Sequence, residues 1–178
     1  MGAPETRSEP TPPLAEVYRA HHAFVWRSLL RLGLPADRVE DAVHELFLVV
    51  ARRLPEFAGR SSLRTWLFAI AVRVAQSFRR DAGRERRHLE RLSHEPRAGA
   101  SDPYAQRDAA VVLYRLLARL SEEQRVVYIL VELEGMTAPE IAGELGVKLP
   151  TVYTRLRAAR AAMERAASEF LEEPRRSP

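Results

Sequence analysis

The segment from Thr137 to Arg160, TAPEIAGELGVKLPTVYTRLRAAR, contains residue types that can bind nucleic acid. Arginine and lysine bind phosphates, and threonine and tyrosine hydroxyls can form hydrogen bonds to DNA. Thr137 and Glu140 can cap a short helix, Gly146 supplies a turn, and Pro150 suits the first turn of a second helix. This order predicts a helix-turn-helix, although a generic amphipathic helical hairpin has the same pattern.

At about 100° per residue, the second predicted helix separates into an apolar face and a polar face. The apolar face must pack inward and consists of Val152, Leu156, Ala159 and Met163. The remaining surface carries arginines and hydrogen-bonding side chains, namely Tyr153, Thr154, Arg155, Arg157 and Arg160. A recognition helix needs this combination of short or donating side chains with arginines around them.

The distribution of charge indicates a second cationic surface. The chain of 178 residues has 28 Lys and Arg against 24 Asp and Glu, a net charge of only +4. Residues 64–97 carry a net charge of +5, residues 98–144 of −4 and residues 145–178 of +3. Two basic segments separated by an acidic one suggest two contacts with a polyanion. Arginines that only form the hydrated outer surface of helices would give the same distribution of charge.

Other kinds of chemistry find little support in the sequence. Cysteine is absent, which excludes disulfides, thiolate metal sites and cysteine nucleophiles. The five histidines show no ligand spacing and no Gly-rich phosphate loop is present, so we expect no metal, no cofactor and no catalysis. Four acidic residues lack a convergent partner and are predicted to form a solvated face: Glu122, Glu123, Glu132 and Glu134. Without a spanning segment or an apolar signal core, we expect a soluble cytoplasmic protein.

Helices have to position these surfaces, since no segment shows the alternation typical of strands. Helical spacing begins at Leu14 and stops at Gly33. A second helix follows Pro35, and Asp37 with Glu40 has the spacing of a capping box. Its apolar stripe consists of Val39, Val43, Leu46, Phe47 and Val50. We therefore expect an all-α chain.

After a loop over 56–61, Ser62 can cap a third helix. We interpret Trp66 in its apolar stripe as a core residue rather than a base-stacking platform. Residues 92–104 have linker composition, and Ser121 with Gln124 then has the spacing of another capping box. The predicted organisation is a disordered tail over 1–13, a helical domain over 14–91, a flexible linker over 92–108, a helix-turn-helix domain over 109–170 and a tail over 171–178.

Two stretches of the chain resemble bacterial extracytoplasmic-function (ECF) sigma factors of the sigma-70 family. The stretch LARLSEEQRVVYILVELEGMTAPEIAGELGVKLPTVYTRLRAARAAM is similar to their region four, and DRVEDAVHELFLVVARRLPEFAGRSSLRTWLFAIAVRVAQSFRR is similar to their region two. The resemblance covers residues 14–88 and 109–168, about three quarters of the chain. Two motifs in the family's order, with a linker between them, are far more specific than a helix-turn-helix alone.

The resemblance implies that the protein binds core RNA polymerase and directs promoter-specific initiation without catalysing a reaction. Region two of such proteins binds the β′ clamp helices, and it opens and reads the minus-ten element. Region four binds the β flap and reads the minus-thirty-five element in duplex DNA. An anti-sigma factor that masks these surfaces is also implied, with no insertion into a membrane.

The resemblance and the residue pattern together assign three sets of candidate residues. The minus-thirty-five contacts are Lys148, Thr151, Tyr153, Thr154, Arg155, Arg157 and Arg160. The minus-ten and melting contacts are Phe57, Arg60, Ser61, Arg64, Arg73, Gln76, Arg79 and Arg80, and their loop over 57–61 matches the place where the family holds a flipped-out base. The polymerase-binding residues are Asp41, His44, Glu45, Leu48 and Arg52.

Several positions depart from residues common in the family, so we predict no promoter sequence: His44, Arg73, Pro150, Tyr153, and Arg157 with Ala158, where the family's arginine appears one residue early. The alternative hypothesis is a stand-alone helix-turn-helix regulator whose N-terminal helices dimerise or sense a ligand. A helical enzyme has almost no support, because no titratable groups are predicted to converge.

Overall fold

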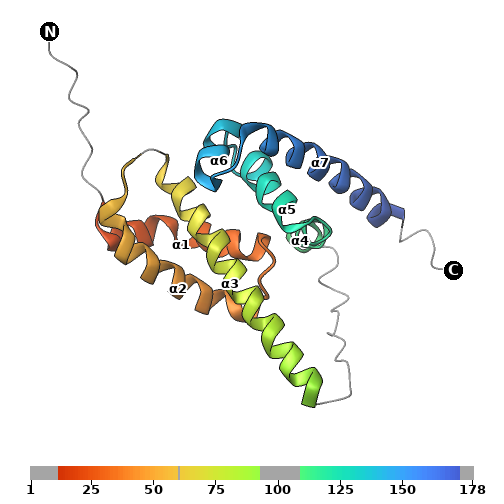
Figure 1. Ribbon diagram of the computed structural model, residues 1–178, viewed down its shortest axis with the longest axis horizontal. Helices are drawn as coiled ribbons and strands as arrows, with labels where there is room; N and C mark the ends of the chain where they lie inside the picture. The colour runs from red at the N-terminus through yellow and green to blue at the C-terminus, as the bar shows by residue number, and fades with distance from the viewer. Residues whose placement is uncertain (1–11, 60, 93–108, 173–178) are drawn as a thin grey trace, which may run out of the picture.

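The computed structural model describes residues 12–59, 61–92 and 109–172, and every regular element in these ranges is helical (Figure 1). The elements are α1 (Leu14–Arg31), α2 (Ala36–Arg53), η1 (Leu54–Glu56), α3 (Leu63–Leu92), α4 (Ala109–Ala118), α5 (Glu122–Tyr128), η3 (Ile129–Leu133), α6 (Ala138–Leu145) and α7 (Leu149–Glu172). The prediction of an all-α chain is confirmed. Most of the predicted tails and of the predicted linker lies outside the described residues.

The N-terminal half consists of α1, α2 and α3, which pack on one another (Figure 1). All five residues of the apolar stripe predicted for α2 are buried, and they meet buried residues such as Val25 and Leu29 of α1 and Leu67 of α3. Burying a side chain of this size stabilises the fold by about 1.5–3 kcal/mol. One apolar stripe on each helix is therefore enough to hold the three together, and the charged faces remain outside.

Hydroxyl side chains cap two helices as the sequence predicts. The Thr65 backbone N–H donates to Ser62 Oγ at 3.1 Å at the start of α3. At the start of α5, Gln124 N donates to Ser121 Oγ at 3.3 Å, and Ser121 N donates to Gln124 Oε1 at 3.2 Å. Each cap satisfies donors that would otherwise lack a partner in the first helical turn.

The capping box predicted at Asp37 and Glu40 is wrong. The N-cap of α2 is Pro35, and no side chain caps this helix end. Asp37 consequently lies inside the first turn, where its carboxylate interacts with the helix dipole instead of accepting a capping hydrogen bond.

The C-terminal half consists of α4, α5, η3, α6 and α7, and α6 with α7 forms the predicted helix-turn-helix (Figure 1). Gly146 ends α6 in the left-handed conformation, with φ of 65°. The four residues of α7 predicted to point inward are all buried. One feature was not predicted: η3 is a π-helical turn, and the Glu134 N–H that follows it bonds to the Ile129 carbonyl at 3.0 Å, five residues back.

The two halves also contact each other, and their buried residues form one continuous cluster. The contacts join α3 to α6 and α1 to α4. Arg125 of α5 crosses the boundary, since its Nη1 donates to the Leu32 carbonyl at 3.0 Å while its Nε donates to the Leu117 carbonyl at 2.8 Å. Burial and then the nearby Arg79 lower the pKa of Arg125. This arginine fastens α5 to the turn that follows α1.

Because of this contact, a substitution at Gly33 should destabilise the protein. Gly33 has φ of +91° and lies against the guanidinium of Arg125. We expect Gly33→Ala to lower the free energy of unfolding by about 1–3 kcal/mol, because the methyl group both strains the backbone and displaces the Arg125 hydrogen bond. Urea denaturation measures this change. Gly59→Ala is the matched control, since Gly59 has φ of +63° with no atom within 4 Å of an added Cβ. Equal losses in the two variants would contradict the role of Arg125.

Candidate nucleic-acid and polymerase interfaces

The outer surface of α7 presents most of the residues predicted to bind duplex DNA. Five of the seven are exposed on α7 or just before it: Lys148, Tyr153, Thr154, Arg157 and Arg160. Thr151 and Arg155 are half-buried. The Thr154 hydroxyl donates to the Pro150 carbonyl at 3.0 Å, a local bond that contact with a base edge would replace.

Two arginines of α7 pair with acidic residues of the same half. Arg160 Nη2 lies 2.7 Å from Glu132 Oε1, and Arg155 Nη2 lies 3.9 Å from Glu123 Oε1. Among the ion pairs formed by the described residues, none includes Arg157. Exposed ion pairs contribute only about 0–1 kcal/mol, so a DNA phosphate can replace the carboxylate at Arg155 or Arg160. Of these three arginines, Arg157 is therefore the one that is exposed and outside the described ion pairs.

Glu140 holds the start of α6, as the sequence predicts. Its Oε2 accepts a hydrogen bond from the Thr137 hydroxyl at 2.6 Å and another from the Thr137 backbone N–H at 2.9 Å. The bond from the hydroxyl, followed by the bond from the backbone, lowers the pKa of Glu140. The carboxylate thus positions the first helix of the helix-turn-helix.

We expect Thr137→Ala to raise the pKa of Glu140 toward its ordinary value, because alanine keeps only the backbone donor. An NMR titration of the side-chain carboxyl measures this pKa. Since the folded pKa lies below the unfolded one, the stabilisation by this cap is present above the unfolded pKa and is lost as the pH falls through the folded pKa. Thr137→Ser keeps the hydroxyl and should keep the low pKa. An unchanged pKa in Thr137→Ala would contradict the assigned hydrogen bond.

The loop after α2 borders a cleft of about 490 Å³ that both halves of the protein line. On the N-terminal side, the rings of Phe57 and Trp66 pack with their centroids 5.3 Å apart. Ser61 also lines the cleft, whereas Arg60 lies outside the described residues. Trp66 is half-buried, so it packs against the core as predicted and in addition forms part of the cleft wall.

The cationic residues of α3 that were predicted to bind the melted strand fall into two groups. Arg73 and Arg80 are exposed, and Gln76 between them is half-buried. Arg64 and Arg79 instead point to the C-terminal half, where both find acidic partners. The predicted cationic residues of α3 therefore lie in two places: Arg73 and Arg80 on the exposed surface, and Arg64 and Arg79 at the boundary between the two halves.

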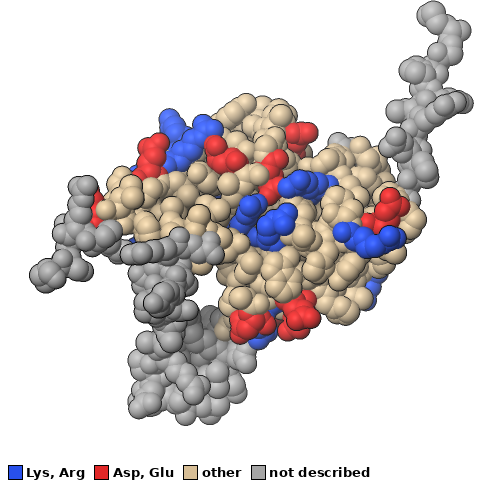
Figure 2. Space-filling model, turned by 180° about the vertical axis from the view of Figure 1, so that it is seen from behind, with Lys and Arg blue, Asp and Glu red and all other residues tan. Residues whose placement is uncertain are grey.

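The solvated face predicted for the acidic residues after α4 is confirmed for Glu122, Glu123 and Glu132, which are exposed, and is wrong for Glu134. The Glu134 side chain is only 3% exposed and lies between Arg31 and Arg64, with an N–O distance of 2.6 Å in each pair. Glu122 lies 3.0 Å from Arg79. Glu134 is the C-cap residue of the π-helical turn η3, and a buried carboxylate requires cationic partners such as these two arginines. Figure 2 shows the result on one face of the molecule, where basic and acidic side chains lie beside one another.

The side of α2 that faces away from the core carries the predicted polymerase-binding residues. All five are exposed and recur at helical spacing on one face: Asp41, His44, Glu45, Leu48 and Arg52. Leu48 is 47% exposed although it is apolar. An exposed leucine surrounded by charged side chains is suited to the centre of a protein interface.

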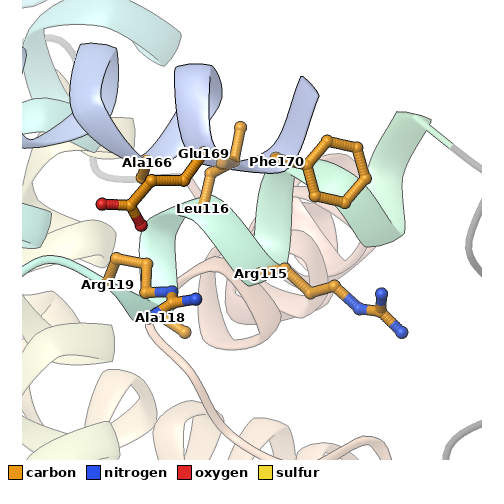
Figure 3. Close-up of a pocket in the computed structure, with 7 residues that line it drawn as sticks. All are labelled: Arg115, Leu116, Ala118, Arg119, Ala166, Glu169 and Phe170. Atoms are coloured by element: carbon orange, nitrogen blue, oxygen red, sulfur yellow. The ribbon is translucent and has the colours of Figure 1, made fainter. Parts of the chain in front are cut away.

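A groove between α4 and α7 was not singled out from the sequence (Figure 3). It has a volume of about 330 Å³ and is lined by Arg115, Leu116, Ala118, Arg119, Ala166, Glu169 and Phe170. The sequence contains a signal for it: Phe170 follows Met163 on the apolar stripe of α7, and Arg115 and Arg119 lie one turn apart on α4.

In the described ranges, no helix has the length and apolar character needed to cross a bilayer. The same ranges bring together no group of three or more His, Asp or Glu residues that could hold a metal ion. The candidate surfaces consist of exposed helix faces and one cleft, which is an arrangement suited to binding macromolecules.

Comparison with known proteins decides the family. The family description of sigma-70 region 2 matches residues 17–85, and that of sigma-70 region 4 matches residues 110–163. Over 149 residues the chain is 30% identical to the ECF RNA polymerase sigma-E factor of Escherichia coli K12, covering 77% of this chain and 78% of that protein. The chain belongs to the ECF sigma factors of the sigma-70 family. The α1–α3 half carries region 2 of this sigma factor and the α4–α7 half carries region 4.

A second relative agrees with this assignment, and two solved structures share the fold. This sigma factor is 27% identical over 156 residues to the ECF sigma factor SigM of Mycobacterium tuberculosis H37Rv, covering 84% of this chain and 74% of that one. Its fold is similar to that of the sigma factor RpoE solved with the anti-sigma factor NepR from Bartonella quintana, with a TM-score of 0.70, 23% identity and coverage of 86% and 96% of the two chains. The structure of CnrH with the cytosolic domain of CnrY is also similar, with a TM-score of 0.63, 23% identity and 88% of each chain covered.

Proposed function

We propose that this sigma factor binds core RNA polymerase and directs initiation at promoters that carry minus-ten and minus-thirty-five elements. The observation that carries the proposal is the presence of two matched regions in one chain, in the order of the family. Each region offers an exposed helix face: α2 in region 2 and α7 in region 4. A stand-alone regulator would use the α7 face in the same way, so the two hypotheses differ in whether the α2 face binds core polymerase or serves dimerisation or ligand sensing.

In region 4, α7 enters the major groove of the minus-thirty-five element. Arg157 and Thr154 face the base edges, while Arg155 and Arg160 exchange their carboxylate partners for phosphates on either side. Lys148 and Thr151 stand near the start of the helix, where the backbone N–H groups favour an anion. This division gives Arg157 a role in sequence discrimination and gives the other arginines a role in overall affinity.

In region 2, the melted strand of the minus-ten element binds along α3 and the loop before it. Stacking of a base on an aromatic side chain contributes about 1–3 kcal/mol, and Phe57 with Trp66 offers aromatic rings at the edge of the cleft. Arg64, Arg73, Arg79 and Arg80 supply the cations that a single strand requires. The α2 face binds the β′ clamp helices, and region 4 binds the β flap.

We further propose an anti-sigma factor as a regulatory partner. One of the two solved relatives compared above, RpoE, is a sigma factor in complex with the anti-sigma factor NepR, and the other, CnrH, is in complex with the cytosolic domain of CnrY. This chain has no cysteine that could be oxidised, so a redox signal has to reach it through another protein. Copurification with the tagged sigma factor from its source cell identifies the partner.

The experiment that separates the proposal from the alternative measures binding to duplex DNA with and without core polymerase. The sigma factor is expected to bind core polymerase in a one-to-one complex, and the complex is expected to select asymmetric sites. Tight binding of a dimer of the chain alone to a palindromic site, with no binding to core polymerase, would support the stand-alone regulator instead.

A further inference from the structure

The first two turns of α7 carry two large apolar side chains on the outside of the protein. Tyr153 is 55% exposed and Leu149 is 36% exposed. Neither residue belongs to the buried cluster or to the apolar residues that pack against it. The Tyr153 side chain also makes no hydrogen bond and no ring contact with any other described residue. Packing within the chain therefore does not explain why these two side chains are apolar.

Leu149 and Tyr153 form what we call the apolar patch of α7. They are one helical turn apart, and Arg157 follows one turn later, so the three residues lie along the same side of the helix. Exposed cations border the patch: Lys148, Arg157 and Arg160. A small apolar surface with cations around it is complementary to a polyanion that is apolar at only a few points.

Duplex DNA has such points in its major groove. Guanine, cytosine and adenine present only hydrogen-bond donors and acceptors there, whereas thymine adds the C5 methyl group. The first residues of a recognition helix are the ones that reach the edges of the bases. The apolar patch occupies this part of α7. The thymine methyl is therefore the group of the major groove that the patch can bury.

The length of the patch sets the number of base pairs that it can contact. Side chains one helical turn apart have Cβ atoms about 5–6 Å apart. Base pairs in B-DNA follow one another at about 3.4 Å. The patch consequently spans about two neighbouring base pairs.

We infer that the apolar patch of α7 reads thymine methyl groups at two neighbouring A·T pairs of the minus-thirty-five element, beside the base that Arg157 reads. This inference rests on the proposed binding of α7 to that element. It makes Leu149 and Tyr153 specificity-determining residues of this sigma factor. Cytosine lacks the methyl group, so a G·C pair at either position leaves the patch without an apolar partner.

The test replaces thymine with deoxyuridine, which keeps the base pairing and removes the methyl group. The probe is a fluorescein-labelled duplex of a promoter whose start site has been mapped with the complex of this sigma factor and core polymerase. Replacing all thymines of the minus-thirty-five element should weaken binding of the complex by about four-fold for each methyl contact, equivalent to about 0.8 kcal/mol for a buried carbon of this size. Equal affinities for the two duplexes would overturn the inference.

Deoxyuridine placed at one position at a time locates the contacts. Two neighbouring A·T pairs should account for most of the loss of affinity. A loss spread evenly over all thymines of the element would indicate a change in the shape or stiffness of the DNA and would overturn the inference. A minus-thirty-five element without two neighbouring A·T pairs would do the same.

Variants of the protein assign the effect to the patch. The double variant Leu149→Ala and Tyr153→Ala should bind the thymine and deoxyuridine duplexes equally, because alanine keeps the helix but withdraws the apolar surface. Leu171→Ala is the matched control, since Leu171 is a 71% exposed leucine at the other end of α7, and it should keep the affinity ratio of the parent. An unchanged ratio in the double variant would overturn the inference.

Tyr153→Phe separates the ring from the hydroxyl. Phenylalanine keeps the apolar ring, so this variant should keep the preference for thymine over deoxyuridine. If the preference disappears in Tyr153→Phe, the hydroxyl makes the contact and the inference is overturned.

Transcription from the unmodified promoter separates this inference from the proposed function. If the sigma factor directs initiation there but its complex binds the thymine and deoxyuridine duplexes equally, the inference fails and the proposed function stands. If the sigma factor adds no start site to those of core polymerase, the proposed function fails and the inference fails with it. The expected result is initiation at the promoter together with a preference for thymine that depends on Leu149 and Tyr153.

Discussion

Leu48→Asp is expected to weaken the binding of this sigma factor to core RNA polymerase by about 30-fold or more, the loss associated with a residue at the centre of a protein interface. Leu48 is 47% exposed on α2 and is surrounded by charged residues of the same face, including Glu45 and Arg52. An aspartate there would place an unpaired charge where the partner excludes water. Titration of labelled sigma factor with purified core polymerase measures the dissociation constant.

The matched control for this variant is Leu14→Asp. Leu14 is 39% exposed and lies in the same region, but it is the first residue of α1 and does not belong to the α2 face. Both substitutions replace an exposed leucine, so both should leave the melting temperature of the free protein nearly unchanged. Only Leu48→Asp should lose core affinity. Equal affinities of the two variants for core polymerase would contradict the assignment of α2 to the polymerase interface.

Arg157→Ala is expected to reduce discrimination between a cognate minus-thirty-five element and a mutated one by about 1–3 kcal/mol, or about 5- to 150-fold. Arg157 is exposed on α7 opposite the buried stripe, and it takes part in none of the ion pairs that the described residues form. An arginine that reads guanine with two hydrogen bonds cannot be replaced by alanine without loss of that readout. Competition between promoters for the sigma–polymerase complex measures the change.

Arg160→Ala provides the comparison for this prediction. Arg160 pairs with Glu132 and is proposed to contact a phosphate. Its loss should weaken binding to all promoters alike and reduce the slope of log affinity against log salt concentration by about one. If Arg157→Ala also weakens every promoter equally, Arg157 is a phosphate contact and not a reader of sequence.

The predictable parts of the fold are those that depend on the residues of a single helix, such as which of its side chains are buried. The apolar stripes of α2 and α7 follow from helical geometry alone, and the caps at Ser62 and Ser121 depend only on neighbouring residues. The cap at Asp37 was wrong because Pro35 takes the N-cap position and moves Asp37 into the first turn. A capping box forms only if the helix begins at one particular residue. The spacing of apolar residues locates the start of a helix only to within one or two residues.

For the candidate surfaces, too, the residues on one helix face could be predicted, whereas the contacts between helices could not. The outer faces of α2 and α7 carry the expected residues, because the direction of a side chain on a single helix follows from its spacing. The partners of Arg64 and Arg79 were not predictable, because they come from residues far away in the sequence. Glu134, the partner of Arg64, directly follows the π-helical turn η3, and helical periodicity in the sequence does not indicate such a turn.

The small net charge of +4 gains a physical explanation from these contacts. The acidic residues between the two basic segments neutralise cations of both: Glu122 and Glu134 pair with Arg79 and Arg64 of region 2, and Glu132 pairs with Arg160 of region 4. Cations that we propose to bind promoter DNA are thus already paired with carboxylates within the chain. We expect the affinity of the free protein for DNA to be lower than its number of arginines suggests.

Transcription by purified core polymerase on genomic DNA fragments, with and without this sigma factor, tests the central claim most directly. Mapping the 5′ ends of the transcripts should reveal start sites that appear only when the sigma factor is added, each preceded by common sequence elements near minus ten and minus thirty-five. The same set of start sites in the presence and absence of the sigma factor would contradict the account.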